Sequence, residues 1–124
     1  MNKTGEDTSQ LVWNQAELLE RVDNDQELLR DLLAIFKDDF PRTMQSLEAA
    51  VSSGDLSATK RLSHTLKGML ASLGGTRAAA TAAKLEQTAN AGDRSSLNAQ
   101  FDNLKNEGAK LLPELEAYMT EVRR

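Results

Sequence analysis

Cysteine is absent from this 124-residue chain, and histidine occurs once, as His64. Without cysteine the chain has no disulfide scaffold, no thiolate nucleophile and no cysteine-based zinc site. A single histidine excludes a histidine-rich metal site, and a Ser-His-Asp triad would have to use that one imidazole. No apolar run is long enough to span a membrane and no signal peptide opens the chain, so we expect a cytoplasmic protein without membrane contact.

The charge balance argues against one broad class of partner. The chain has 15 Lys and Arg against 19 Asp and Glu, a net charge of −4, whereas a general binder of nucleic acid usually has a basic excess. The charges are unevenly placed, because residues 54–94 hold three acidic and six basic side chains while the segments on either side are net acidic. The basic segment is the one that contains His64.

The composition predicts an all-α protein. Alanine and leucine are abundant, β-branched residues are sparse, and no stretch alternates polar and apolar residues. No repeat or linker divides the chain, so we predict a disordered lead-in over residues 1–10 and one domain over residues 11–124. Long amphipathic helices joined by short loops favour an antiparallel up-down four-helix bundle with a short N-terminal capping helix.

Capping residues and glycines predict where the helices begin and end. In chain order the predicted helices are a short one capped by Asn14, a second from Asn24 to about Ser53, a third from Asp55 to Leu73, a fourth from Thr76 to near Ala91, and a fifth from Ser95 or Ser96 towards Val122. Pro41 and Pro113 lie inside two of them and are expected to bend them. The alanines of the fourth helix should allow its neighbours to approach closely.

The predicted third helix separates an apolar face from a polar one. At 100° per residue the apolar stripe spans about 60° of the helix surface. Its members are Leu62, Leu66, Met69 and Leu73. His64 lies roughly 180° from the middle of this stripe. A lone histidine is most often an ordinary core or surface residue, and this orientation excludes the core.

The neighbours of His64 on that outer face favour phosphate chemistry. Lys67 and Gly68 follow one turn later, where a lysine can neutralise phosphate oxygens on the imidazole and a glycine clears side-chain bulk from the approach. A mid-helix glycine costs about 1 kcal/mol relative to alanine. Tight helix packing is the structural explanation for Gly68, but its outward position favours a functional one.

These residues resemble a known family. The segment His64-Thr65-Leu66-Lys67-Gly68, followed by Leu73-Gly74 and Lys84-Leu85-Glu86, is similar to the pattern of histidine-containing phosphotransfer (HPt) domains. That pattern is an H-x-L-K-G core, a glycine about ten residues on, and a Leu-Glu pair in the next helix. The resemblance covers roughly residues 14–120. The context it suggests first is the HPt domain of a hybrid sensor histidine kinase, and a free-standing relay protein is the alternative.

The resemblance implies a role for each site residue. His64 would accept a phosphoryl group on Nε2, Lys67 would steady the phosphate, and Gly68 would leave room for the partner. Glu86 would accept a hydrogen bond from Nδ1. The expected docking surface consists of Lys60, Arg61, Ala71 and Lys84, with Met69 and Leu70 at its edge.

The implied function is that of a phosphorelay intermediate in two-component signal transduction. His64 would take the phosphoryl group from the aspartate of a response-regulator receiver domain and pass it to another, or the reverse. The chain lacks the glycine-rich loops that bind ATP, so it would be a carrier without a cofactor, and the receiver would supply Mg²⁺. We expect a monomer.

Two alternatives belong to other classes. One is a helical-bundle interaction module that binds a receiver or kinase domain without transferring phosphate. The other is a hydrolase that pairs His64 with Ser63 or Ser72. The hydrolase is the weaker hypothesis, because a serine on a helix surface has neither an oxyanion hole nor a pocket.

Overall fold

The computed structural model describes residues 11–122, so the lead-in predicted for residues 1–10 lies outside the described residues. The elements are α1 (Gln15–Arg21), α2 (Gln26–Ser53), α3 (Leu56–Ser72), α4 (Thr76–Asn90), a 3₁₀ turn η2 (Arg94–Ser96) and α5 (Leu97–Val122). Residues 11–122 contain no β-strand, which confirms the all-α prediction.

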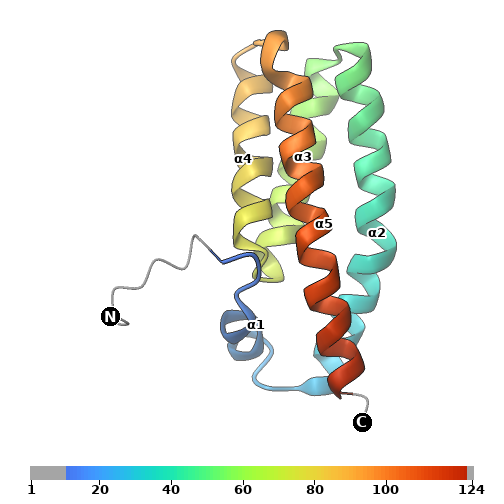
Figure 1. The fold of residues 1–124 in the computed structure, drawn as a ribbon. Coiled ribbons are helices and arrows are strands. Elements are labelled where there is room, and N and C mark those ends of the chain that lie inside the picture. The colour runs from blue at the N-terminus through green and yellow to red at the C-terminus, as the bar shows by residue number, and fades with distance from the viewer. Residues whose placement is uncertain (1–10, 123–124) are drawn as a thin grey trace, which may run out of the picture.

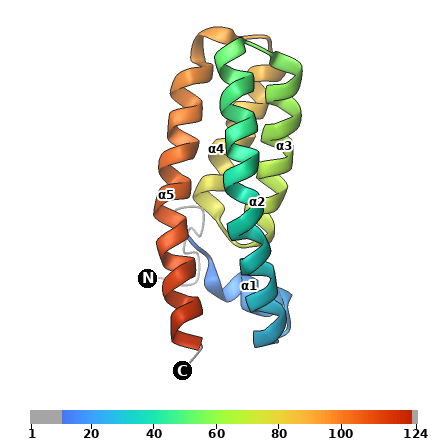
Figure 2. The same ribbon diagram turned by 90° about the vertical axis from the view of Figure 1, so that its right-hand side faces the viewer.

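Helices α2 to α5 run up and down in turn and form an antiparallel four-helix bundle (Figures 1 and 2). The short helix α1 packs at the end of the bundle where α2 begins and α5 finishes. Within the part of the chain that the structure describes, no helix is both long enough and apolar enough to cross a membrane. The predicted bundle with an N-terminal capping helix is therefore confirmed.

The core is formed mainly by leucine, with a few aromatic side chains. Its largest fully buried members are Leu18, Leu29, Leu33, Leu47, Leu66, Leu70, Leu85, Leu97, Leu104, Leu111 and Leu115. Aromatic packing closes the lower end, where Trp13 and Tyr118 meet edge to face with their ring centroids 5.6 Å apart. Because this core involves every helix, the bundle is a rigid support for the residues on its surface.

Three predicted helix starts are wrong by one or two residues. Asn24 does not cap α2, because it adopts the left-handed conformation (φ 59°) in the turn after α1; Asp25 accepts the capping hydrogen bond from Leu28 N at 3.0 Å. Thr76 is the first residue of α4 rather than its cap, which is Gly75. Asn14, by contrast, caps α1 as predicted and accepts from Glu17 N.

The start of α5 also differs from the prediction. Ser95 and Ser96 belong to the 3₁₀ turn, which Asp93 caps by accepting hydrogen bonds from the Ser95 backbone and hydroxyl. The α-helix begins only at Leu97, where a buried apolar side chain first joins the core. Both α2 and α5 continue through their prolines, and the bends expected there stay predictions.

The segment around α1 holds the C-terminal end of α3. Trp13 Nε1 donates to Leu73 O (2.8 Å), Asn14 N donates to Gly74 O (2.7 Å), and Arg21 Nη1 donates to Ser72 O (2.6 Å). Gly74 is required here, since its φ is +81° and a Cβ would lie 2.5 Å from the backbone oxygen of Asn14. The α3–α4 turn is thus held in place from outside as well as by its own glycines.

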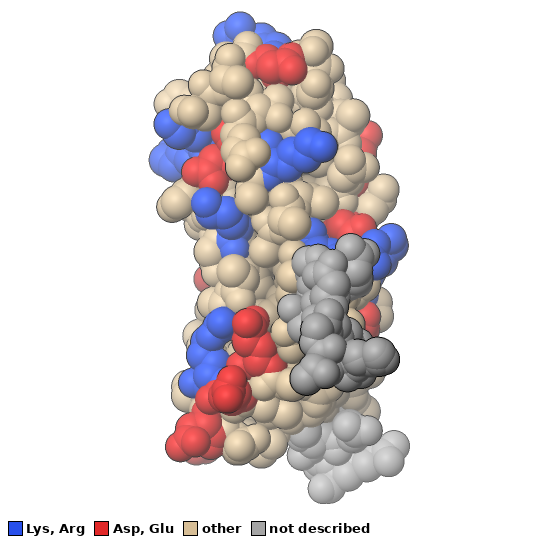
Figure 3. Space-filling view, turned by 90° about the vertical axis from the view of Figure 1, so that its left-hand side faces the viewer, with Lys and Arg blue, Asp and Glu red and all other residues tan. Residues whose placement is uncertain are grey.

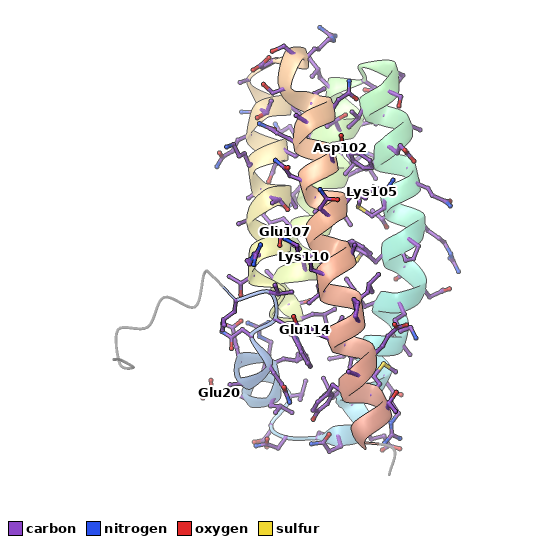
Figure 4. All side chains as sticks on the ribbon, viewed as in Figure 1. Glu20, Asp102, Lys105, Glu107, Lys110 and Glu114 are labelled. Atoms are coloured by element: carbon purple, nitrogen blue, oxygen red, sulfur yellow. The ribbon has the colours of Figure 1, made fainter. Side chains whose placement is uncertain are left out.

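An ion-pair cluster joins α4 to α5. Arg77 Nη2 lies 2.9 Å from Glu107 Oε2, and Lys110 Nζ lies 3.5 Å from the same oxygen. Figure 4 shows Glu107 and Lys110 on the side of α5 that turns toward α4. The Glu107 side chain is only 15% exposed, so this carboxylate is partly shielded from water.

Candidate functional site

The outer face of α3 carries His64. Its side chain is 67% exposed, whereas Ser63 and Leu66 on the inner face are fully buried. The orientation predicted from the helical period is therefore confirmed. Nothing in the described bundle covers the imidazole, so a second protein can reach it.

Small residues bring α4 close to this helix. Ala78 and Ala82 are buried with 1% and 0% exposure, and α3 packs more extensively against α4 than against any other helix. The two helices are joined by the short Gly74–Gly75 turn. Close backbones let a glutamate of α4 reach the outer face of α3, where a larger residue at Ala82 would hold the helices apart.

That glutamate is Glu86, and it contacts His64. Its Oε2 lies 2.9 Å from His64 Nδ1. A carboxylate can only accept a hydrogen bond, so the proton of the neutral ring is on Nδ1 and the lone pair is on Nε2. The nitrogen that is free to attack is therefore Nε2.

The second oxygen of Glu86 contacts a lysine. Lys67 Nζ lies 2.9 Å from Glu86 Oε1, so one carboxylate bridges the imidazole and the ammonium. The hydrogen bond from Lys67 is the main cause of a lowered Glu86 pKa; the contact with His64 lowers it further and burial opposes both. Glu86 is thus held in the ionised form that the His64 contact requires.

Sequence reasoning missed this Lys67–Glu86 pair. Lys67 lies on the same face as His64, as predicted, but its ammonium is on the carboxylate in the unphosphorylated domain. The position of Lys67 could have predicted the pair. Lys67 lies one turn from His64, so it can reach the same glutamate that was expected to contact His64.

Gly68 lies in open space. A Cβ added to it would have no neighbour within 4 Å, so packing inside this bundle does not require a glycine there. The structural explanation by tight helix packing is therefore wrong. Gly75, by contrast, does meet a packing limit, since a Cβ there would lie 2.8 Å from Leu111 Cδ2.

The comparison with known protein families identifies the family of this chain. The sequence model described as the Hpt domain matches residues 31–124, which is more than half of the chain. The chain belongs to the Hpt domain family. Its role is histidine phosphotransfer in phosphorelay signalling, and Hpt domains act as carriers in that transfer.

A solved structure shares the fold. It is histidine-containing phosphotransfer protein B (HptB) from Pseudomonas aeruginosa PAO1, with a TM-score of 0.85 and 21% sequence identity over 90% of this chain and 97% of that chain. At this identity the likeness supports the fold alone. The comparison with curated proteins gave no match.

The exposure of the expected docking residues agrees with a docking role for all of them except Leu70. All four residues of the docking surface, Lys60, Arg61, Ala71 and Lys84, are exposed, and Met69 is half-buried. Leu70 is wrong as a docking residue, because its exposure is 0%. The buried face of α3 is centred nearer to α4 than the leucine stripe suggested, and Leu70 falls within it.

The hydrolase alternative has no support in the geometry. Ser63 is fully buried and points away from the face that carries His64. Ser72 is exposed, but its hydroxyl donates to Met69 O at 2.9 Å, two turns beyond the histidine. Neither hydroxyl is placed to be activated by the imidazole.

Proposed function

We propose that His64 is the phosphoacceptor of this Hpt domain and that Nε2 is the atom that carries the phosphoryl group. The observation that supports this most directly is the 2.9 Å contact between Nδ1 and Glu86. It leaves Nε2 as the nucleophilic nitrogen of an exposed ring. The group would come from the aspartate of one receiver domain and pass to the aspartate of another.

The chemistry of the step balances without further reactants. The Nε2 lone pair attacks phosphorus of an aspartyl phosphate, the Nε2–P bond forms, and the P–O bond to the aspartate breaks. The electron pair of that bond leaves on the aspartate carboxylate. The ring becomes positively charged, and the Glu86 carboxylate stabilises this charge at Nδ1. Transfer to a second receiver reverses these bond changes at a new aspartate.

Lys67 has a supporting role in this proposal. Its ammonium neutralises and fixes Glu86, whose side chain is 18% exposed, so the carboxylate stays aimed at Nδ1. Both oxygens of Glu86 already have a partner, and the Lys67 ammonium at 2.9 Å repels a metal cation from this carboxylate. We therefore propose that the Mg²⁺ used in phosphoryl transfer belongs to the receiver, and that this domain has no cofactor of its own.

The partners are receiver domains, with which Hpt proteins interact in phosphorelays. The face that α4 presents shows Lys and Arg side chains over its upper half, with some Asp and Glu among them and mostly uncharged surface around them (Figure 3). Residues 54–94, which include α3 and α4, are net basic. A receiver has an acidic phosphorylation site, so this sign of charge favours its approach. We propose a cytoplasmic monomer that does not bind nucleic acid, because each transfer needs only one acceptor and one docked receiver.

The test is transfer from a phosphorylated receiver. Incubation with ³²P-labelled receiver should move label onto the domain as an acid-labile, base-stable adduct, and His64→Gln should abolish the uptake. Circular dichroism and receiver binding of the variant provide the folding control. Label on His64→Gln would refute the assignment, and receiver binding by the wild type without any transfer would indicate the interaction module instead.

A further inference from the structure

A shallow hollow in the surface lies beside His64, on the N-terminal side of the residue along α3. Its lining consists of Ser57, Lys60, Arg61, His64, Thr65 and Glu86. Helical side chains lean toward the N-terminus of their helix, so the His64 ring extends over this hollow rather than toward Gly68. Lys67 is on the C-terminal side and does not line the hollow.

The basic side chains around His64 differ in what they already contact. Lys67 is paired with Glu86 at 2.9 Å. Among residues 11–120, no carboxylate lies within 4.0 Å of Lys60 or Arg61. Both side chains are exposed. The hollow beside His64 is therefore lined by two cations without a carboxylate partner in the described part of the chain, whereas the charge of Lys67 is already neutralised by Glu86.

The orientation of the imidazole distinguishes Arg61 from Lys60. Nδ1 is turned toward Glu86 on α4, so Nε2, at the other edge of the ring, faces away from α4. Around α3, Arg61 lies about 60° from His64 on the side away from Lys67, while Lys60 lies about 40° from His64 on the same side as Lys67. Arg61 also borders the groove between α2 and α3, which confirms that it is on the α2 side.

We propose that Arg61 is a catalytic residue of this domain: its guanidinium contacts the phosphoryl oxygens as the group moves on or off Nε2 of His64. Lys67 is then a positioning residue that acts through Glu86. A guanidinium is suited to this contact, because it presents parallel N–H donors that match two phosphate oxygens and it keeps its charge. This proposal rests on the proposed function of His64, and it moves to Arg61 the phosphate contact that the resemblance implies for Lys67.

The experiment separates contact with the phosphoryl group from docking. Single-turnover transfer is measured over a range of domain concentrations with a phosphorylated receiver, which yields a maximal rate and an apparent affinity. The measurement is repeated with phosphoramidate, a small donor that needs no docking surface. Arg61→Ala should lower the maximal rate about tenfold to a hundredfold with both donors, and Arg61→Lys should restore part of it.

Three further variants define the contrast. Lys60→Ala should weaken receiver binding with a smaller loss of maximal rate. Lys105→Ala, on α5, is the control for loss of one positive charge. In ¹⁵N spectra of the unphosphorylated domain, Lys67→Ala should lower the population of the Nδ1–H tautomer of His64, whereas Arg61→Ala should leave that population unchanged.

Two results would overturn the proposal. One is a wild-type maximal rate for Arg61→Ala, or a loss confined to the receiver reaction, which would make Arg61 a docking residue. The other is an equal loss of maximal rate in Lys60→Ala and Arg61→Ala. Neither result affects the role of His64, because that role fails only if His64→Gln still takes up label.

Discussion

The two sides of the bundle are packed in different ways. On the α2–α5 side the packing is large and aromatic. Phe36 and Phe40, both on α2, stack with their ring centroids 4.9 Å apart. Gly108 of α5 leaves the space for the Phe40 ring, since a Cβ there would lie 2.8 Å from Phe40 Cζ. Between α3 and α4 the contacts are small, with Ala78 and Ala82 fully or almost fully buried.

The difference explains where the site is. Small side chains bring α3 and α4 close enough for a glutamate of one helix to contact a histidine and a lysine of the other at 2.9 Å each. Aromatic packing on the other side provides buried area and stiffness, and its exposed ion pair Lys37–Glu116 contributes little. The α3–α4 pair therefore carries the candidate site, and we call it the chemical side. The α2–α5 pair mainly stabilises the fold, and we call it the bracing side. The following variants test this division.

The largest effect on stability is expected on the bracing side. Phe40→Ala removes a ring that is 5% exposed, and we expect the free energy of unfolding to fall by about 3–5 kcal/mol. Chemical denaturation measures this loss, with Phe40→Leu as the milder control. Phosphotransfer per folded molecule should stay near the wild-type rate, and a large drop in that rate would contradict the division.

Overpacking the chemical side should lower both the stability of the fold and the rate of phosphotransfer. Ala82 has 0% exposure one turn before Glu86, so Ala82→Leu should destabilise the fold by about 1–3 kcal/mol and move α4 away from His64. Phosphotransfer should slow even under conditions where the variant is fully folded. Ala80→Leu, at an exposed position of the same helix, is the matched control. Wild-type transfer by folded Ala82→Leu would show that close approach of the helices is unnecessary.

Two similar carboxylates, one at the candidate site and one in the ion-pair cluster between α4 and α5, can be compared directly. Glu86 and Glu107 are 18% and 15% exposed, and each contacts two groups that can be cationic. Glu86→Gln removes the charge that stabilises the imidazolium, and we expect about tenfold slower phosphotransfer. Glu107→Gln should leave the rate unchanged while it weakens the α4–α5 contact. Equal rates for the two variants would show that Glu86 has no special role.

Gly68 should separate stability from docking. Because a Cβ there has no neighbour within 4 Å, Gly68→Ala is expected to stabilise the isolated domain by up to about 1 kcal/mol through helix propensity. Transfer from a receiver should nevertheless slow, and phosphorylation by phosphoramidate should not. A destabilised variant would show that the glycine has a role within the bundle after all.

The smallest expected effect concerns acid. The pKa of Glu86 is lowered from 4.5, mainly by the hydrogen bond from Lys67, so its contacts stabilise the fold above that value and are lost as the pH falls through the lower folded value. Unfolding curves from about pH 6 to about pH 3 should therefore show a smaller loss of stability in Glu86→Gln than in the wild type. Part of the loss should remain, because the Ser95 hydroxyl also lowers the pKa of Asp93. Parallel curves would contradict this prediction.

Much of the fold was predictable because it depends on local periodicity. Helix number, topology and the outward position of His64 follow from the spacing of apolar residues and from capping residues such as Asn14. The burial of Leu70 was not predictable in this way, because the leucine stripe alone does not reveal that small polar residues, Thr59 and Ser63, are also buried against the neighbouring helices. Starts of helices were missed where two adjacent residues can both cap, as with Asn24 and Asp25.

The absences noted at the outset have different origins. One histidine, no cysteine and no nucleotide-binding loop are properties of the sequence, and together with the H-x-L-K-G segment they favoured phosphotransfer through an imidazole over the alternatives. Only the tertiary structure decided that Glu86 pairs with Lys67 and that Arg61 is left without a carboxylate partner among the described residues. The physical reason is that the helical period sets angles around one helix, whereas ion pairing depends on how closely a second helix approaches and in what register.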